Sequence, residues 1–276
     1  MRYLFLLCLS LLAFGCDGEE PTGGEEPTGG EEPTGGEDPT TGISWVNIPA
    51  GSFMMGSEER AEQPIHQVTV QAFQMSETEV TVGQYRQCFE AGRCSEPSNE
   101  AEGGCTWSAS PGDKEDHPIN CVDWPEARTF AVWAGGDLPI EAQWEYAARG
   151  GEDFEYAGSD NVDEVAWYDE NSQHYTQPVK TKRANGYGLY DMSGNVWEWT
   201  LDEWHDNYQG APSEAETPWG NVPPCSQVCD DMSSRRVYRG GCWRYDAWTL
   251  RVALRSSSYP DYRSYDLGFR VRRTLP

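Results

Sequence analysis

The sequence predicts one α+β domain with few and short helices, behind an N-terminal export signal and a low-complexity segment. Three observations support this fold class. Helical periodicity is confined to segments between about residues 81 and 149. The flanking stretches are typical of short strands, turns and aromatic loops. The 276 residues include 29 glycines and 12 tryptophans, which favours a loop-rich fold held by aromatic packing.

Residues 1–15 have the features of a lipoprotein signal peptide. Residues 4–14 are almost wholly apolar, and this run is too short for a membrane span, which takes ~20 residues. Small residues precede Cys16 in an order that resembles a bacterial lipobox. We therefore expect a diacylglyceryl group on Cys16, with membrane lipid as partner and a cell-envelope location, periplasmic or at the cell surface. The alternative is an ordinary secretory signal cut at nearly the same place.

Residues 16–42 contain the predicted lipidated cysteine and then a tether. From residue 18 the segment repeats Gly-Glu-Glu-Pro-Thr-Gly and has no bulky apolar side chain. It therefore cannot bury enough surface to offset the entropy of ordering, and we expect a disordered acidic spacer. The folded domain is predicted to span residues 43–276.

The charge of the chain argues against several classes of partner. The formal net charge is −26, and residues 1–42 hold one arginine and nine acidic residues, so −18 remains for the domain. Nucleic-acid binding requires a basic face, and docking on anionic lipid requires basic clusters. We expect a monomer that binds no nucleic acid.

Seven cysteines follow the predicted lipidation site, and their number suits an exported domain braced by disulfides. They are Cys88, Cys94, Cys105, Cys121, Cys225, Cys229 and Cys242. We expect the first four to pair in sequence order because their spacing is close. The next two are expected to pair across a tight turn, which leaves Cys242 with a free thiol. The alternative pairs Cys242 with one of those two.

The first part of the domain is predicted to contain strands. Residues 45–55 are expected to form a strand pair, or a strand and a turn, punctuated by Pro49 and Gly51. Residues 67–73 alternate apolar and polar side chains, a pattern typical of a half-buried strand.

Three helices are predicted after these strands. The first covers residues 81–91. Asp123 can cap the N-terminus of the second, which has Pro125 in its first turn and ends at two glycines. The third runs from about residue 140 to 149, where Gly150 stops it.

Seven blocks of the domain resemble, in order, those of the formylglycine-generating enzyme family, also called sulfatase-modifying factor domains. They are residues 48–57 (IPAGSFMMGS), 66–70 (HQVTV), 77–81 (ETEVT), 138–151 (LPIEAQWEYAARGG), 185–199 (NGYGLYDMSGNVWEW), 238–243 (YRGGCW) and 268–271 (GFRV). The resemblance implies a fold related to C-type lectins and poor in regular secondary structure.

The resemblance also implies a catalytic centre that this chain lacks. Family enzymes use oxygen to oxidise a sulfatase cysteine to formylglycine, and two of their cysteines hold copper(I) as a linear bis-thiolate. Those thiols follow the block that ends at Trp243, but residues 243–255 contain no cysteine. Copper is therefore not expected. Cys242, where the family usually has serine, remains a candidate reactive thiol if Arg239 and Arg244 lower its pKa. A buried or disulfide-bonded cysteine is the alternative.

Calcium is the cofactor that the resemblance implies. Calcium ions take several carboxylate and carbonyl oxygens. The family's site corresponds to the side chains of Asp191 and Glu198 and the carbonyl groups of Gly194 and Val196. A turn with two solvated acids is the alternative. A looser match places a second calcium site at Glu164, Val165, Asn171 and Gln173.

These observations favour a surface-anchored family domain without the copper-binding cysteines, acting as a non-catalytic or redirected binding or scaffold module. One alternative is an oxidase of the formylglycine-generating type that acts on exported proteins. Another is a lectin-like receptor for glycans or proteins. Arg251, Arg255 and Arg270 are expected to form internal salt bridges rather than to bind a ligand, because the domain is acidic.

Overall fold

The computed structural model describes residues 34–38, 40–98, 104–222 and 233–275. The predicted signal peptide, Cys16, most of the predicted tether, Cys225 and Cys229 lie outside the described residues. Within the described ranges, no helix is long and apolar enough to cross a membrane.

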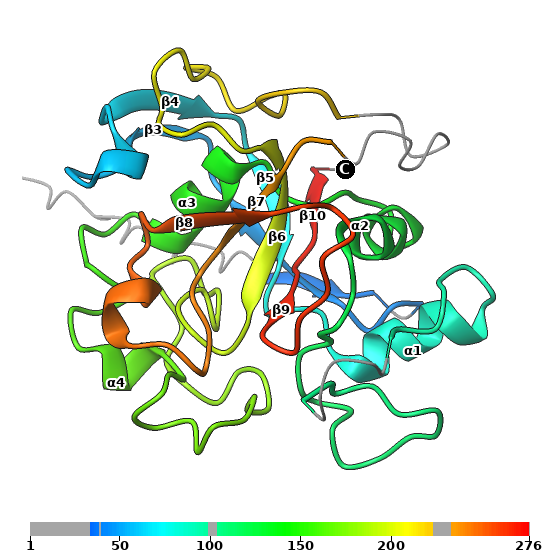
Figure 1. Cartoon of the computed structure of the whole chain (residues 1–276). Coiled ribbons are helices and arrows are strands. Elements are labelled where there is room, and N and C mark those ends of the chain that lie inside the picture. Colours follow the sequence, from blue (N-terminus) through cyan, green and yellow to red (C-terminus); the bar gives the residue numbers. More distant parts are fainter. Residues whose placement is uncertain (1–33, 39, 99–103, 223–232, 276) are drawn as a thin grey trace, which may run out of the picture. The chain divides into compact units, whose positions relative to one another are not determined.

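The first sheet joins the beginning and the end of the domain (Figure 1). Its strands are all antiparallel, in the order β1 (Thr34–Glu37), β2 (Ser44–Ile48), β5 (Phe73–Ser76) and β10 (Arg272–Thr274). The domain boundary at residue 43 stays a prediction; β1, which lies before it, pairs with β2 through Thr34 and Val46. An edge strand is held by backbone hydrogen bonds, so it needs no run of apolar side chains.

The second sheet is a ribbon of β3 (Gly51–Met55) and β4 (His66–Val70). Residues 45–55 thus form two strands, but β2 and β3 belong to different sheets, so the predicted strand pair within this segment is wrong. The strand predicted for residues 67–73 is also divided, because β4 ends at Val70 and β5 of the first sheet starts at Phe73.

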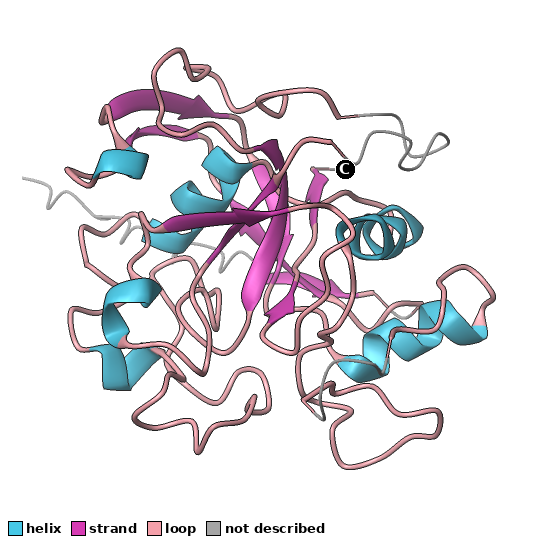
Figure 2. Cartoon of the chain, viewed as in Figure 1, coloured by secondary structure: helices cyan, strands magenta, loops and turns pink. Residues whose placement is uncertain are grey.

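The third sheet has the order β8 (Arg255–Ser258), β7 (Arg236–Arg239), β6 (Trp197–Glu203) and β9 (Leu267–Gly268). The pair β6–β9 is parallel and the others are antiparallel. Loops make up most of the surrounding chain, as Figure 2 shows. The predicted α+β fold with few and short helices is confirmed.

The three predicted helices are all present. In α1 (Val82–Glu90) and α2 (Trp124–Trp133), the N-caps Thr81 and Asp123 each accept a hydrogen bond from a backbone N–H of the first turn. The third helix, α3 (Glu141–Arg149), ends at Gly150, whose φ of 60° is the left-handed geometry that favours glycine.

Three shorter helical segments were not predicted. They are α4 (Val162–Val165) and the 3-10 turns Arg60–Glu62 and Ala247–Leu250.

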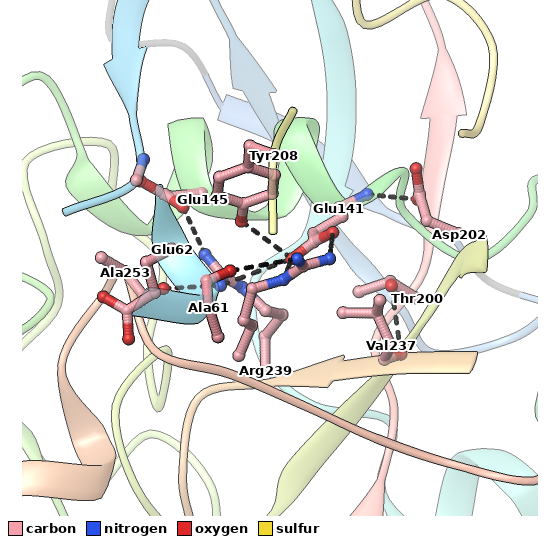
Figure 3. Close-up of polar contacts among 12 residues, drawn as sticks. Ala61, Glu62, Glu141, Glu145, Thr200, Asp202, Tyr208, Val237, Arg239 and Ala253 are labelled. Carbon is pink, nitrogen blue, oxygen red and sulfur yellow. Dashed lines mark hydrogen bonds and ion pairs between the residues drawn. The ribbon is translucent and has the colours of Figure 1, made fainter. Parts of the chain in front are cut away.

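Helix α3 contacts both the β3–β4 ribbon and the β6–β7 pair, and its buried face carries charge. Arg239 of β7 lies 2.5 Å from Glu145 and also donates to the carbonyl groups of Val252 and Ala253 (Figure 3). Arg255 of β8 binds Glu141 at 2.7 Å. All four of these charged side chains are at most 3% exposed.

The internal salt bridges predicted for three arginines are confirmed. The pairs are Arg251–Glu62 at 3.0 Å, Arg255–Glu141 at 2.7 Å and Arg270–Glu198 at 2.7 Å. These guanidinium groups therefore serve the fold and are not held open for a ligand.

Replacing Arg239 by methionine should destabilise the domain strongly, because it leaves the buried Glu145 without its main partner from the third sheet. Breaking a buried pair by removing one partner costs about 3–5 kcal/mol. Urea denaturation measures this loss. The matched control is Arg235→Met, since that side chain is 44% exposed and should cost under ~1 kcal/mol. Equal losses in the two variants would contradict the account.

Stability should also depend on pH through Asp202 of β6. Its carboxylate accepts hydrogen bonds from the backbone N–H groups of Glu141 (2.6 Å) and Trp219 (2.8 Å). Burial, and then the charge of Glu141, raise the pKa of Asp202 to about 7. An acid with a raised folded-state pKa stabilises most below its unfolded pKa, near 4, and this contribution is lost as the pH rises through about 7.

In urea denaturation at pH 4 to 8, the free energy of unfolding of the wild type relative to Asp202→Asn should therefore fall by roughly 2–4 kcal/mol with rising pH. A difference that is constant or grows with pH would contradict this assignment.

Candidate functional site

Two glycines at the end of β7 set the position of Cys242. Gly240 and Gly241 have φ angles of 98° and 73°, in the left-handed region. A Cβ atom on Gly241 would lie 2.7 Å from the carbonyl oxygen of Thr249, so a larger residue does not fit there. The chain therefore turns sharply, buries Cys242 completely and brings Trp243 towards the surface.

The environment of Cys242 opposes thiolate formation. Its Sγ lies 3.7 Å from Oδ2 of Asp266 and donates to it. Burial and the charge of Asp266 raise the pKa of this thiol well above its usual range, and Arg244 lowers it less. The other arginine, Arg239, is engaged with Glu145. Cys242 is thus a buried cysteine, as one of the two interpretations from the sequence had it, and the arginines near it in the sequence are not the dominant charges around its sulfur.

A cleft of about 300 Å³ opens beside this turn. The rings of Trp243 and Tyr265 lie 5.8 Å apart in its wall, and the guanidinium of Arg244 lies 5.0 Å from the Tyr265 ring and donates to its hydroxyl. Arg244 also pairs with Asp266 at 3.6 Å. The lining residues are Gly104, Lys114, His174, Tyr175, Thr176, Trp243 and Tyr265.

Aromatic side chains line this cleft together with Lys114 and His174, so it can offer packing and polar contacts to a ligand. The sulfur of Cys242 is 0% exposed and does not line the cleft.

The described cysteines supply one free thiol. Disulfides join Cys88 to Cys94 and Cys105 to Cys121, as predicted. Cys242 is the free cysteine of the described part of the chain. The predicted pairing of Cys225 with Cys229 falls on residues outside that part.

The predicted calcium loop lies directly behind the Cys242 turn. Gly194 donates from its backbone N–H to the carbonyl of Gly240 at 2.8 Å, and Trp243 donates to the carbonyl of Asn195 at 2.9 Å. The loop that the family uses for calcium therefore supports the turn that positions the cleft.

Three buried carboxylates gather around this loop. Those of Asp191, Glu198 and Glu79 interact electrostatically with one another and with Arg270. Burial raises the pKa of Asp191 to about 6 and, with the two other acids, raises that of Glu79. Negative charge therefore exceeds the positive charge that Arg270 supplies.

In the first predicted calcium site, Asp191 has one oxygen without a partner, whereas Glu198 already accepts hydrogen bonds from Trp144 and Arg270. Oδ1 of Asp191 is buried and has no hydrogen-bond partner, whereas its Oδ2 accepts from the backbone of Lys180 at 2.7 Å. Both oxygens of Glu198 bind Arg270, so this ligand would be shared. Among the described residues, no group of three His, Cys, Asp or Glu side chains could hold a metal, so backbone carbonyls such as those of Gly194 and Val196 would be needed.

The second predicted calcium site is less well supported. Glu164 binds Arg183 at 3.2 Å and accepts from Ser159. The side chain of Asn171 bonds to Tyr168 and Ala166 within its own loop. Val165 is buried, and Gln173 has a φ of 60°.

Sequence reasoning missed Glu79, Asp266 and the cleft wall formed by Lys114, His174 and Tyr175. Glu79 lies in a block that carries the resemblance, but its contact with Asn195 (2.7 Å) joins residues 116 positions apart. Local pattern gives no signal for such contacts. The sequence signal that could have pointed to the cleft was the presence of tyrosines in acidic loops.

The comparisons with known proteins agree with this fold. The chain matches the family described as "Sulfatase-modifying factor enzyme 1-like domain" over residues 32–275. It is 32% identical to the formylglycine-generating enzyme of Streptomyces coelicolor, over 82% of this chain and 87% of that enzyme. It is 33% identical to the serine/threonine-protein kinase pkn1 of Chlamydia caviae, over 83% of this chain but 37% of the kinase.

Among solved structures, PvdO from Pseudomonas aeruginosa is similar with a TM-score of 0.74 and 28% identity, covering 90% of this chain and all of that one. The match over nearly the whole described domain, together with the enzyme relative, establishes the family. This chain belongs to the sulfatase-modifying factor (formylglycine-generating enzyme) family.

Proposed function

We propose that this protein is a non-catalytic or redirected member of its family, which binds a segment of an exported protein in the cleft beside Trp243 and Tyr265. The observation that carries the proposal is the fully buried thiol of Cys242, the one free cysteine among the described residues. A linear copper(I) bis-thiolate needs two soft thiolates side by side. The relative named as a protein kinase supports the view that this domain also occurs in proteins with other activities.

The cleft suits an extended segment of protein. Trp243, Tyr265 and Tyr175 present aromatic surface, and Tyr175 is 65% exposed. Lys114 and Arg244 lie at this wall and could hold a carboxylate of the partner. The predicted lipid on Cys16 and the predicted tether would present this cleft to partners in the cell envelope.

The purified protein, supplied with copper(I) and oxygen, should leave the thiol of a sulfatase-derived cysteine peptide intact. Mass spectrometry detects the change from thiol to aldehyde, and the Streptomyces coelicolor enzyme serves as the positive control. Copper-dependent conversion that is lost in Cys242→Ser would overturn the proposal.

We also propose calcium as a structural cofactor of the Asp191–Glu198 loop, supported by the orphaned Oδ1 of Asp191 and the excess of buried carboxylates. Calcium at about 100 times its Kd adds about 2.7 kcal/mol to stability. That corresponds to a rise in Tm of about 5 °C or more for a domain of this size.

Differential scanning fluorimetry should show this rise with calcium, no comparable rise with magnesium, and its loss in Asp191→Asn. The matched control is Asp169→Asn, an exposed acid paired with His174 at the surface. No effect of calcium on the wild type, or the same rise in Asp191→Asn, would refute the assignment.

A further inference from the structure

A second pocket, of about 350 Å³, lies between β3 and the end of α3 and shares no lining residue with the cleft beside Trp243. Figure 1 shows these two elements side by side. We call it the β3–α3 pocket. Its wall includes Phe53, Tyr146, Tyr187, Arg149, Glu152 and Asp153.

Three aromatic rings form a continuous wall of this pocket. The ring centroids of Phe53 and Tyr146 lie 5.3 Å apart, and those of Tyr146 and Tyr187 lie 5.8 Å apart. The planes are tilted by 51° and 54°, so the rings do not stack on one another and keep parts of their faces open. Gly51 allows this arrangement, because a Cβ atom there would lie 2.4 Å from the Tyr146 hydroxyl.

Two carboxylates stand beside the rings. Gly150 and Gly151, with φ angles of 60° and 76°, turn the chain at the end of α3 and bring Glu152 and Asp153 to the pocket. Both side chains line the pocket and bring negative charge to it. Oε2 of Glu152 itself is buried, 3.2 Å from where a Cβ atom on Gly186 would lie, so this oxygen does not face the open pocket.

The positively charged side chain in the wall of this pocket, Arg149, is already paired with an acid outside the pocket. The guanidinium of Arg149 binds Glu145 at 2.7 Å and donates to the carbonyl of Gly56, and its side chain is 17% exposed. It does not bond to Glu152 in the structure. The groups that line the pocket are therefore aromatic rings, the two carboxylates, and the hydroxyl groups of Ser52, Tyr146 and Tyr187.

This combination selects a particular chemistry. Aromatic faces attract cations within about 6 Å of the ring centroid, and methylated ammonium groups are suited to them. A neutral sugar can bond to the hydroxyl groups of Ser52, Tyr146 and Tyr187, but it would leave the negative charge of Glu152 and Asp153 without a partner. We propose that the β3–α3 pocket binds an alkylammonium group of the choline type.

The test uses choline and purified full-length protein, with chemical shifts of the tyrosine and phenylalanine rings as the readout. Choline should bind in a salt-sensitive manner, and its uncharged isostere 3,3-dimethylbutan-1-ol should bind roughly tenfold more weakly. Glu152→Gln and Phe53→Leu should each weaken choline binding by a similar factor. Glu90→Gln, at the far end of α1, is the matched control and should not change it.

Phosphatidylcholine vesicles provide a separate arm of the experiment. Binding of both choline and vesicles identifies a lipid headgroup as the source, and binding of free choline alone identifies a soluble cation. Equal affinity for choline and its isostere, tighter binding of N-acetylglucosamine than of choline, or unchanged affinity in both pocket variants would overturn the proposal.

Discussion

Two glutamates of α3 and two arginines of the third sheet determine how this domain is assembled. Glu141 and Glu145 lie one helical turn apart, so they project from the same face of the helix. Arg239 and Arg255 are direct partners across β7 and β8. In the buried interior, Arg239 lies 2.5 Å from Glu145 and 3.5 Å from Glu141, and Arg255 lies 2.7 Å from Glu141. Charges buried in this way are tolerated only when paired, so these pairs fix how α3 lies against β7 and β8.

The chain segments that follow these paired residues on β7 and on α3 each form part of a site. Directly after Arg239 the chain enters the glycine turn that buries Cys242 and exposes Trp243 in the cleft. In the other direction, the last turn of α3 carries Tyr146 and Arg149 into the β3–α3 pocket. The buried ion pairs thus fix the positions of the two surface sites, although their charged groups do not line either site.

Sequence predicted well what depends on neighbouring residues. Capping by Thr81 and Asp123, and the stop at Gly150, are local signals, and the close cysteine pairs follow from spacing. The family blocks identified the fold as a whole. Contacts between distant segments could not be predicted in this way. Thr34 pairs with Val46 in neighbouring strands, and the partner of the Cys242 thiol, Asp266, lies 24 residues away. Arg239 is close to Cys242 in the sequence, yet its guanidinium group pairs with Glu145.

The central claim is that this protein keeps the family fold but lacks, among its described residues, the pair of free thiols that copper(I) binding requires. Copper(I) titration in competition with a chromogenic chelator tests it most directly, with wild type and Cys242→Ser compared side by side. The account predicts that the two proteins bind the same amount of copper(I), because the Cys242 sulfur is buried against Asp266. One equivalent of copper(I) that is held by the wild type and lost in Cys242→Ser would contradict it.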